Sequence, residues 1–424
     1  MQRVVIVGGG VIGLSAAFAL ERRGCQVTVI EARTPGHGAS FVNAGWVTPS
    51  LAGPLPAPGL VRTSLRWMLH ADSPLYIRPR IDPDLLRWLV AFWRRCNARA
   101  YQAGLEATAE LNRRTMPLYD DLAAAGVAFE MHRAGLLLAA CSPAALEADL
   151  AEIEPLRSFG IEVRGPLHGD ELRELEPALG PAITGALWVA SERHVRPDSL
   201  TQGLVRYLHG RGVVIHTGTT VTGFEASAGR VSAVLTDRER FAADAAVICA
   251  GAWTGKVARM AGVQLPFQGG KGYCLDFVPP PREVRHPIYL HEARVAVTPL
   301  HGMVRLAGTM EFSGLNETIR PARVAAIARQ AARCLTGWPA EYRRATVGCG
   351  LRPMTPDGLP VIGLLPGYRN LAVASGHAML GVTLAPATAE ALADLMTTGQ
   401  APPVLKPFDA GRFRQQELRR SPDA

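Results

Sequence analysis

The first thirty residues contain two short apolar segments separated by a helical pattern. Residues 4–7 (Val-Val-Ile-Val) form an unbroken β-branched run, which is typical of a strand buried on both faces of a parallel sheet. In residues 14–20 apolar side chains recur at helical spacing, and Gly24 is typical of a helix C-terminus. A second apolar segment, residues 27–30, ends at Glu31. This pattern predicts a strand, a helix and a second parallel strand.

Beyond residue 31 the pattern changes several times, and no internal repeat is visible. Residues 54–83 are rich in proline. Further strands are predicted within residues 183–189, 213–249 and 265–311, and helices at 84–128 (two helices), about 200–209, 320–335 and 384–399. Only the last dozen residues are expected to be disordered.

Three glycines connect the first predicted strand to the helix. Gly8, Gly10 and Gly13 form a G-x-G-x-x-G motif, and Glu31 follows 18 residues after the last of them. Gly8 permits a tight turn, Gly10 lets the backbone approach a pyrophosphate, and Gly13 lets the helix pack closely on the strand. A carboxylate at the end of the second strand accepts hydrogen bonds from ribose hydroxyls, whereas an NADP site favours arginine there. The sequence therefore predicts a dinucleotide site for NAD or FAD.

Length and composition indicate a large globular protein without a disulfide framework. The 424 residues are 48% hydrophobic and 19% charged, which suffices for two or three domains with a sizeable core. The seven cysteines include no C-x-x-C pair, and the histidines show no metal-binding spacing along the chain. We therefore expect a reduced, cytoplasmic protein that has no metal site and borrows a cofactor for any redox chemistry.

The net charge of +8 does not indicate nucleic-acid binding. Nearly all of the 45 basic residues are arginines, mostly interleaved with acidic residues as on solvated helix faces. Residues 78–99 carry six arginines against Asp82 and Asp84. This stretch suits either docking on the anionic inner face of a membrane or a helix with its apolar face buried and its arginines outward, and we favour the buried helix. No stretch reaches the ~18 consecutive apolar residues of a membrane span.

Five motifs follow one another along the chain. They are the N-terminal glycine-rich unit, Ala44-Gly45, Cys249-Ala250-Gly251-Ala252-Trp253, Gly350-Leu351-Arg352-Pro353 and Gly376-His377. With these motifs the chain resembles the FAD-dependent D-amino acid oxidase superfamily over about residues 2–400. Residues 40–50, 73–80 and 351–358 resemble the D-amino acid dehydrogenases in particular. Glycine oxidases and oxidases of N-substituted glycines share the same scaffold.

The resemblance implies an α/β (α+β) fold with two domains. It implies a discontinuous Rossmann-like FAD-binding domain from residues 1–60, 191–264 and 345–405, and a substrate-binding domain with a mixed β-sheet and helices from residues 61–190 and 265–344. Residues 406–424 are expected to form a C-terminal tail. No cysteine matches a position at which relatives attach flavin covalently, so the FAD is expected to be non-covalent.

The resemblance also implies which residues contact FAD. The ADP half is expected to meet Gly8, Gly10, Gly13, Glu31, Val221 and, close by, Gly251. The loop beneath the flavin is expected to contain Ala39, Ser40, Ala44, Gly45 and Trp46. The turn and helix start that face the flavin pyrimidine are expected to contain Gly376, His377, Leu380, Gly381 and Thr383. A helix N-terminus at that place stabilises the negative charge of reduced flavin.

Oxidation of an amino acid by hydride transfer from Cα to flavin N5 needs a neutral amine and a fixed carboxylate. Arg352 is the candidate for binding the carboxylate, because a guanidinium offers two parallel hydrogen bonds. Tyr273 is expected either to add its hydroxyl or line the pocket, or only to fill a strand. Trp46, Lys271 and His377 are further pocket candidates. A structural role is favoured for Lys271, and a backbone and packing role for His377.

The expected function is oxidation of a D-amino acid, or of a related small amino acid with a secondary amine, to an imine that hydrolyses to a 2-oxo acid. The electron acceptor, oxygen or a quinone or dye, stays open. Close D-amino acid dehydrogenases read Gly-His-Gly and Gly-Trp-Thr where this chain has Gly376-His377-Ala378 and Gly381-Val382-Thr383. This departure favours, as the main alternative, a peroxide-forming oxidase of glycine or N-substituted glycine. An RNA-directed aminomethyl oxidase and a non-catalytic flavin scaffold rank lower.

Overall fold

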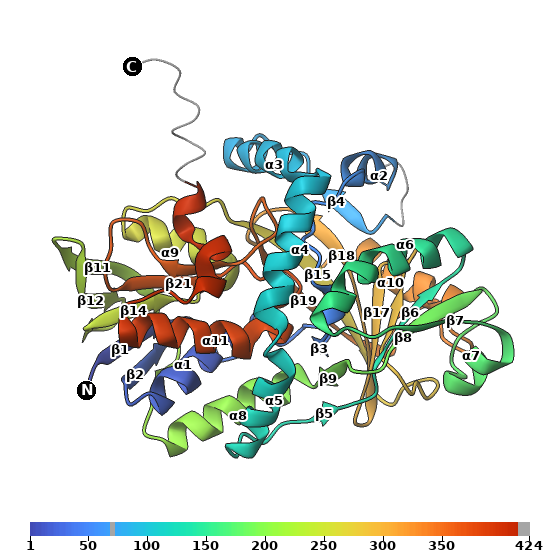
Figure 1. Ribbon diagram of the computed structural model, residues 1–424, viewed down its shortest axis with the longest axis horizontal. Coiled ribbons are helices and arrows are strands. Elements are labelled where there is room, and N and C mark those ends of the chain that lie inside the picture. The colour runs from blue at the N-terminus through green and yellow to red at the C-terminus, as the bar shows by residue number, and fades with distance from the viewer. Residues whose placement is uncertain (68–72, 414–424) are drawn as a thin grey trace.

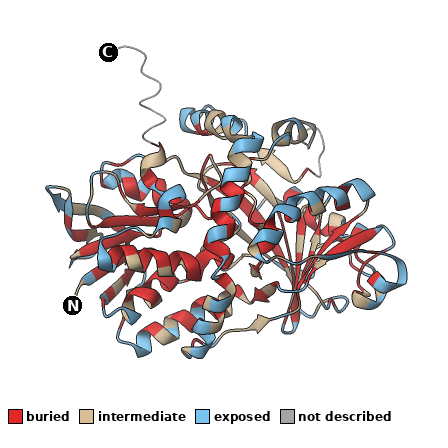
Figure 2. Ribbon diagram, viewed as in Figure 1, coloured by how far each residue is buried: buried red, intermediate tan, exposed pale blue. Residues whose placement is uncertain are grey.

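The structure is a computed structural model that describes residues 1–67 and 73–413 (Figure 1). Two large sheets lie side by side, and helix α4 (Ala98–Asn112) runs across the region between them. Buried residues concentrate in the strands of both sheets and in the helices packed against the first sheet (Figure 2). The mixed α/β fold that the sequence predicts is confirmed.

The first sheet has six strands, drawn from three separate parts of the chain. In spatial order they are β10 (Val214–His216), β2 (Gln26–Ile30), β1 (Arg3–Val7), β14 (Ala245–Ile248), β21 (Leu371–Ser375) and β20 (Val361–Leu364). All neighbours are parallel except β20 and β21. Val4 and Ile6 enter one core cluster and Val5 and Val7 another, as expected for a strand buried on both faces.

Helices cover one face of this sheet and a small sheet covers the other. The helices are α1 (Val11–Arg22), α8 (Pro197–Gly210) and α11 (Gly381–Thr398). The opposite face packs against β11 (Val221–Ser227), β12 (Arg230–Thr236), β13 (Arg240–Ala242) and α9 (Thr254–Met260). Helix α11 begins at Gly381, earlier than the predicted start at residue 384.

The second sheet has nine strands and is mixed. In spatial order eight of them are β19 (Ala345–Met354), β15 (Gln268–Phe277), β18 (Met303–Phe312), β17 (Val295–Leu300), β16 (Ile288–Leu290), β6 (Leu136–Ala140), β8 (Gly185–Val189) and β7 (Arg164–Leu167), and β4 (Leu75–Ile77) pairs with β18. Helix α10 (Pro321–Cys334) packs on one face. Strand β19 belongs to this sheet, whereas the sequence assigns residues 345–405 to the FAD-binding domain.

The remaining helices and a small sheet are shorter. They are α2 (Leu60–Trp67), α3 (Pro83–Arg95), α5 (Thr115–Ala124), α6 (Pro143–Ile153), α7 (Gly169–Leu175) and the small sheet of β3 (Trp46–Val47), β9 (Arg193–Val195) and β5 (Met131–His132). Residues 84–128 hold three helices instead of the predicted two. Helix α3 ends at Arg95, and Asn97 caps α4 by accepting from the Ala100 N–H at 3.0 Å. The elements within residues 131–175 escaped prediction, since they are short and lack a long periodic pattern.

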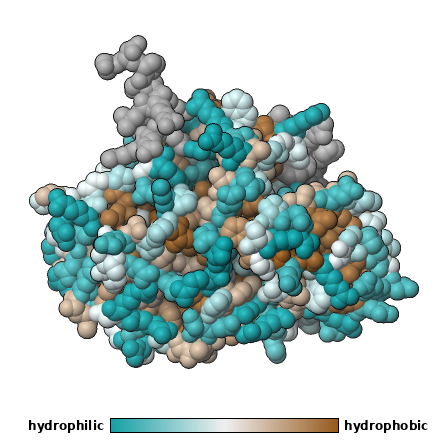
Figure 3. Space-filling model, in the orientation of Figure 1, coloured by the Kyte–Doolittle hydropathy of each residue, from teal (hydrophilic) through white to brown (hydrophobic). Residues whose placement is uncertain are grey.

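Five 3₁₀ helices complete the fold: Pro49–Leu51, Glu154–Phe159, Gly251–Trp253, Pro403–Phe408 and Ala410–Phe413. The last two order part of the predicted tail, and residues 414–424, which include most of the predicted disordered segment, lie outside the described residues. The face in Figure 3 mixes hydrophilic residues with small hydrophobic areas. Among the described residues, no helix combines the length and apolar character that crossing a membrane requires.

Candidate active site

A first cavity, of about 530 Å³, lies beside the glycine-rich turn that connects β1 to α1. Its lining includes these residues predicted to contact FAD: Gly8, Gly10, Glu31, Ala39, Ser40, Val221, Gly251, His377 and Gly381. The first turn of α1 also borders this cavity, and the free N–H groups of a helix N-terminus favour an anion.

Glycine is required at two positions of this turn. Gly8 has a φ of +111°, and a Cβ atom there would lie 2.4 Å from the carbonyl oxygen of Cys249. A Cβ atom on Gly13 would lie 1.9 Å from the carbonyl oxygen of Gly8. The helix therefore packs on the turn at a distance that only glycine allows, which brings its N-terminus to the cavity.

The carboxylate of Glu31 is held at the same cavity by backbone groups. It accepts hydrogen bonds from the N–H of Gly9 at 2.7 Å and of Arg33 at 2.8 Å. The Ser40 hydroxyl accepts from the N–H of Val11 at 3.0 Å, which ties the loop after β2 to the start of α1. Glycine turn, helix N-terminus and carboxylate together fit a dinucleotide.

A second cavity, of about 610 Å³, adjoins the first. Ala39, Asn43, His377 and Ala378 line both cavities, so the two form one continuous site. The ring of His377 is buried, with Nε2 3.0 Å from the Thr388 hydroxyl and Nδ1 without a hydrogen-bond partner among the described residues. Burial lowers the pKa of His377 to about 3, so the ring is neutral. Its free nitrogen is a group that a bound ligand can satisfy.

Arg352 on β19 lines the second cavity. Its guanidinium lies over Gly272, where a Cβ atom would be 2.1 Å from Nη1. Nη1 donates to the carbonyl oxygen of Thr309 at 2.9 Å, and no ion pair with Arg352 is found in residues 1–67 and 73–413. Burial lowers the pKa of Arg352 to about 10, so it remains charged at neutral pH. A partly buried cation that lines a cavity without a counter-charge suits a carboxylate-binding site.

Tyr273 follows Gly272 on β15, and successive residues of a strand point to opposite faces. Tyr273 borders the second cavity, but its ring belongs to the core cluster that packs under α10 and its hydroxyl donates to Glu311 at 2.8 Å. Lys271 Nζ lies 3.0 Å from the other oxygen of Glu311 and donates to the Thr318 carbonyl at 2.8 Å. Lys271 lines neither cavity.

Trp46 forms part of the wall of the second cavity. Its indole Nε1 donates to the Thr298 hydroxyl at 2.9 Å, and its ring meets Tyr289 edge-on at 5.9 Å. The Thr383 hydroxyl, in the first turn of α11, donates to the Trp46 carbonyl at 3.0 Å and accepts from the Thr48 N–H at 3.2 Å. The start of α11 is thereby fixed to the strand that carries Trp46.

The remaining predicted FAD contacts divide into two groups. Ala44, Leu380 and Thr383 line the second cavity. Gly13, Gly45 and Gly376 line neither cavity. A Cβ atom at Gly45 would lie 2.1 Å from the Val195 carbonyl oxygen, so this glycine serves a close backbone approach. Ala378, at the position where close dehydrogenases have glycine, adopts a φ of +49° that favours glycine.

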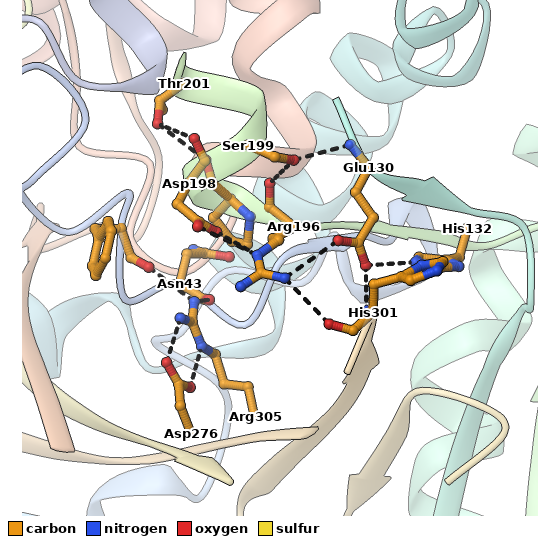
Figure 4. Close-up of polar contacts among 12 residues, drawn as sticks. Asn43, Glu130, His132, Arg196, Asp198, Ser199, Thr201, Asp276, His301 and Arg305 are labelled. Atoms are coloured by element: carbon orange, nitrogen blue, oxygen red, sulfur yellow. Dashed lines mark hydrogen bonds and ion pairs between the residues drawn. The ribbon is translucent and has the colours of Figure 1, made fainter. Parts of the chain in front are cut away.

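Sequence reasoning missed the arginine that fixes the loop between the two cavities. Arg305 on β18 makes two hydrogen bonds to Asp276, at 2.7 and 2.8 Å (Figure 4). It also donates to the carbonyl oxygens of Phe41 and Asn43, each at 2.8 Å. The signal available in the sequence was an arginine within the apolar run at residues 303–307.

The far end of the second cavity is polar, and its outer wall is apolar. At the far end the Tyr289 hydroxyl accepts from Arg294 Nη1 at 2.9 Å. The outer wall is α3, whose buried residues Leu85 and Trp88 pack in one cluster with Phe312. Ile81, Leu86 and Trp93 in the same stretch are exposed, so the choice between a buried helix and membrane docking for residues 78–99 stays a prediction.

The chain matches the DAO family of FAD dependent oxidoreductases over residues 3–395. It belongs to this family, and the prediction of an FAD-dependent oxidoreductase with a Rossmann-like FAD-binding fold is confirmed. The D-amino acid dehydrogenase of Cereibacter sphaeroides (strain ATCC 17029 / ATH 2.4.9) is 35% identical over 412 residues, which cover 95% of this chain and 93% of that one. The D-amino acid dehydrogenase of Phenylobacterium zucineum is 34% identical over 415 residues, 95% of each chain.

Two solved structures show the same fold at lower identity. L-proline dehydrogenase from P. horikoshii has a TM-score of 0.77 at 20% identity and covers 98% of each chain. Glycine oxidase from Geobacillus kaustophilus has a TM-score of 0.75 at 24% identity and covers 97% of this chain and 99% of that one.

Proposed function

We propose that this protein is a dehydrogenase of D-amino acids. The observation that carries the proposal is the position of Arg352, a partly buried guanidinium without an ion-pair partner in the described residues, in the cavity next to the dinucleotide cavity. A guanidinium binds a carboxylate through two parallel hydrogen bonds. The dehydrogenases from C. sphaeroides and P. zucineum, which match nearly the whole chain, support the substrate class.

In this proposal the first cavity holds the ADP half of FAD, with the pyrophosphate at the N-terminus of α1 and the ribose at Glu31. The four residues that line both cavities border the flavin ring system. When bound, FAD accepts a hydride from the substrate Cα, which leaves an imine that water hydrolyses to a 2-oxo acid and ammonia. Arg352 holds the carboxylate and thereby aims Cα, and Trp46 bounds the space for the side chain.

We also infer that the electrons pass to a quinone or dye rather than to oxygen, because the relatives that cover most of the chain are dehydrogenases. The cytoplasm is the proposed location. Seven free cysteines support it, since thiols stay reduced in that compartment.

The test is anaerobic bleaching of the flavin absorbance near ~450 nm, the band of a protein-bound oxidised flavin. D-amino acids should bleach it, and their L-enantiomers should not. Admitting air should restore the colour slowly, and a quinone or dye should restore it fast. Bleaching only by glycine or sarcosine, with fast recovery and peroxide, would contradict the proposal and assign a glycine-type oxidase.

A further inference from the structure

Three side chains from distant parts of the chain converge outside both cavities. Glu130 precedes β5, His132 is its last residue, and His301 lies in the turn between β17 and β18. One ligand atom of each lies within 4.8 Å of the ligand atoms of the other two. Figure 4 shows the carboxylate of Glu130 next to His132 and His301. None of the three lines the proposed substrate or FAD cavity.

We propose that Glu130, His132 and His301 bind one divalent transition-metal ion of the Zn²⁺ class, with water at the fourth position. Two imidazole nitrogens and one carboxylate oxygen form a donor set that Zn²⁺ prefers over Mg²⁺ or Ca²⁺. Two ligand atoms on one tetrahedral Zn²⁺ are about 3.3 Å apart, since each bond is about 2.0 Å. Glu130 Oε1 and His132 Nε2 are already 2.8 Å apart, and the exposed His301 has a ring nitrogen within 4.8 Å of the ligand atoms of both.

The ligands are held in place by neighbours. The ring of His132 stacks on His194 with centroids 4.7 Å apart and planes 12° apart, and His194 is only 1% exposed. This stack fixes the plane of the His132 ring. The N–H of Glu130 donates to the Ser199 hydroxyl at 2.9 Å, and the N–H of His301 donates to Glu130 Oε1 at 2.7 Å. Such contacts around the ligands are what orient them in metal sites.

One cation lies close to the cluster. Arg196 Nη1 is 3.6 Å from Glu130 Oε2 and donates to the His301 carbonyl at 3.3 Å. Its Nε donates to both oxygens of Asp198, at 3.2 and 3.3 Å, so its charge is shared with a second carboxylate (Figure 4). Arg196 therefore lies beside Oε2 of Glu130, and Oε1, which faces His132 Nε2 and accepts from the His301 N–H, is the oxygen that the ion would share with that hydrogen bond.

The proposed ion would tie together two strands that lead to the cavity wall. His132, His194 and Trp46 lie abreast on β5, β9 and β3. Trp46 donates to Thr298 on β17, and β17 leads to His301. Binding of an ion to the folded state alone stabilises that state by mass action. Zn²⁺ should therefore raise the melting temperature of the FAD-loaded enzyme.

The test is calorimetric titration of the FAD-loaded, chelator-treated protein with Zn²⁺, together with melting curves. We expect one Zn²⁺ per chain and a higher Tm in excess Zn²⁺, and no effect of Mg²⁺. His301→Ala, at an exposed turn, should weaken Zn²⁺ binding at least about tenfold and abolish the Tm shift, and Glu130→Gln should act alike. The matched control is His209→Ala, which removes an exposed histidine from the end of α8 and should bind Zn²⁺ like the unaltered chain.

Absence of stoichiometric Zn²⁺ binding would overturn the proposal, as would equal affinities of the unaltered chain and His301→Ala. A loss in His209→Ala as large as in His301→Ala would overturn it too, because it would indicate adventitious binding to surface histidines. His301→Ala decides the question even if Glu130→Gln fails to fold. The titration uses no amino acid, so its outcome is independent of the proposed D-amino acid oxidation.

Discussion

Two arginines on the same face of the second sheet, the buried Arg305 and the partly buried Arg352, have charges that face different surroundings. Arg305 on β18 makes two hydrogen bonds to the carboxylate of Asp276 and two more to backbone carbonyls. Arg352, two strands away on β19, has one backbone carbonyl, that of Thr309, and no counter-charge in the described part of the chain.

Because these surroundings differ, the pKa of Arg305 is raised and the pKa of Arg352 is lowered. Burial lowers the pKa of Arg305, but the hydrogen bonds and charge of Asp276 outweigh it and raise the pKa above its usual value. Burial acts alone on Arg352 and lowers its pKa to about 10. Arg305 is therefore a completed part of the fold, whereas Arg352 carries a desolvation cost that an anionic ligand offsets.

The largest effect is expected from Arg352→Ala. It should lower kcat/KM for D-amino acids about 1000-fold, corresponding to about 4 kcal/mol for a lost buried charge contact. FAD content and Tm should stay as in the unaltered protein, because no ion pair is broken. Steady-state assays with a dye measure kcat/KM, and melting curves measure Tm. Arg352→Lys, which keeps the charge but not the two parallel hydrogen bonds, should lie in between, and normal kinetics in either variant would remove Arg352 from the substrate site.

Arg305→Met should lower the stability of the fold, which Arg352→Ala leaves unchanged. It leaves Asp276 partly buried and unpaired, so the free energy of unfolding should fall by about 3 kcal/mol. Urea unfolding of the FAD-loaded protein measures the loss. The double variant Arg305→Met/Asp276→Leu removes both charges and should recover most of the stability. An unstable double variant would mean that the hydrogen bonds to the carbonyls of Phe41 and Asn43, rather than the ion pair, carry the effect.

The dinucleotide unit was predictable from the sequence because all of its signals are local. Strand, glycine turn, helix, second strand and Glu31 occur within the first 31 residues, and each has one steric or hydrogen-bonding reason. The resemblance added the later FAD contacts, most of which the structure places at one of the two cavities.

Which residues face the second cavity depends on strand register, and the sequence does not reveal that register. The pairing of β15 with β18 is irregular between Lys271 and Tyr273, and a shift of one residue moves a side chain to the other face. The sequence therefore left open whether Tyr273 takes part in the pocket or only fills a strand. The expectation of no metal site rested on spacing along the chain. Such spacing cannot show that the turn at His301 lies beside Glu130.

The comparison of buried charged groups also applies to an acid, Glu192. It is fully buried and accepts a hydrogen bond from the Ser50 N–H at 2.9 Å, and no cation in the described residues lowers its pKa. Burial raises its pKa to about 8, only partly offset by hydrogen bonds from Ser50. The folded state thus binds a proton that the unfolded state releases above about pH 4.3, so stability should fall as the pH rises from there to about 8.

Glu192→Gln should remove this pH dependence, because the amide does not ionise. We expect it to be about 3 kcal/mol more stable than the unaltered protein at pH 8, relative to their difference near pH 5. Melting curves between those pH values measure the difference. Glu225→Gln, at an exposed ion pair with Arg240, is the matched control and should keep the original slope. A slope unchanged in Glu192→Gln would show that Glu192 is ionised in the folded protein.

The smallest effect is expected from Tyr273→Phe, which removes only the hydroxyl. Burial raises the pKa of Glu311, but hydrogen bonds from Ser313, Tyr273 and Lys271 outweigh it, so Glu311 stays ionised and keeps partners in the variant. The free energy of unfolding should fall by about 1 kcal/mol, and KM for D-amino acids should change less than about threefold. A rise in KM of tenfold or more with unchanged stability would contradict this, and would mean that Tyr273 leaves Glu311 to join Arg352 when substrate binds.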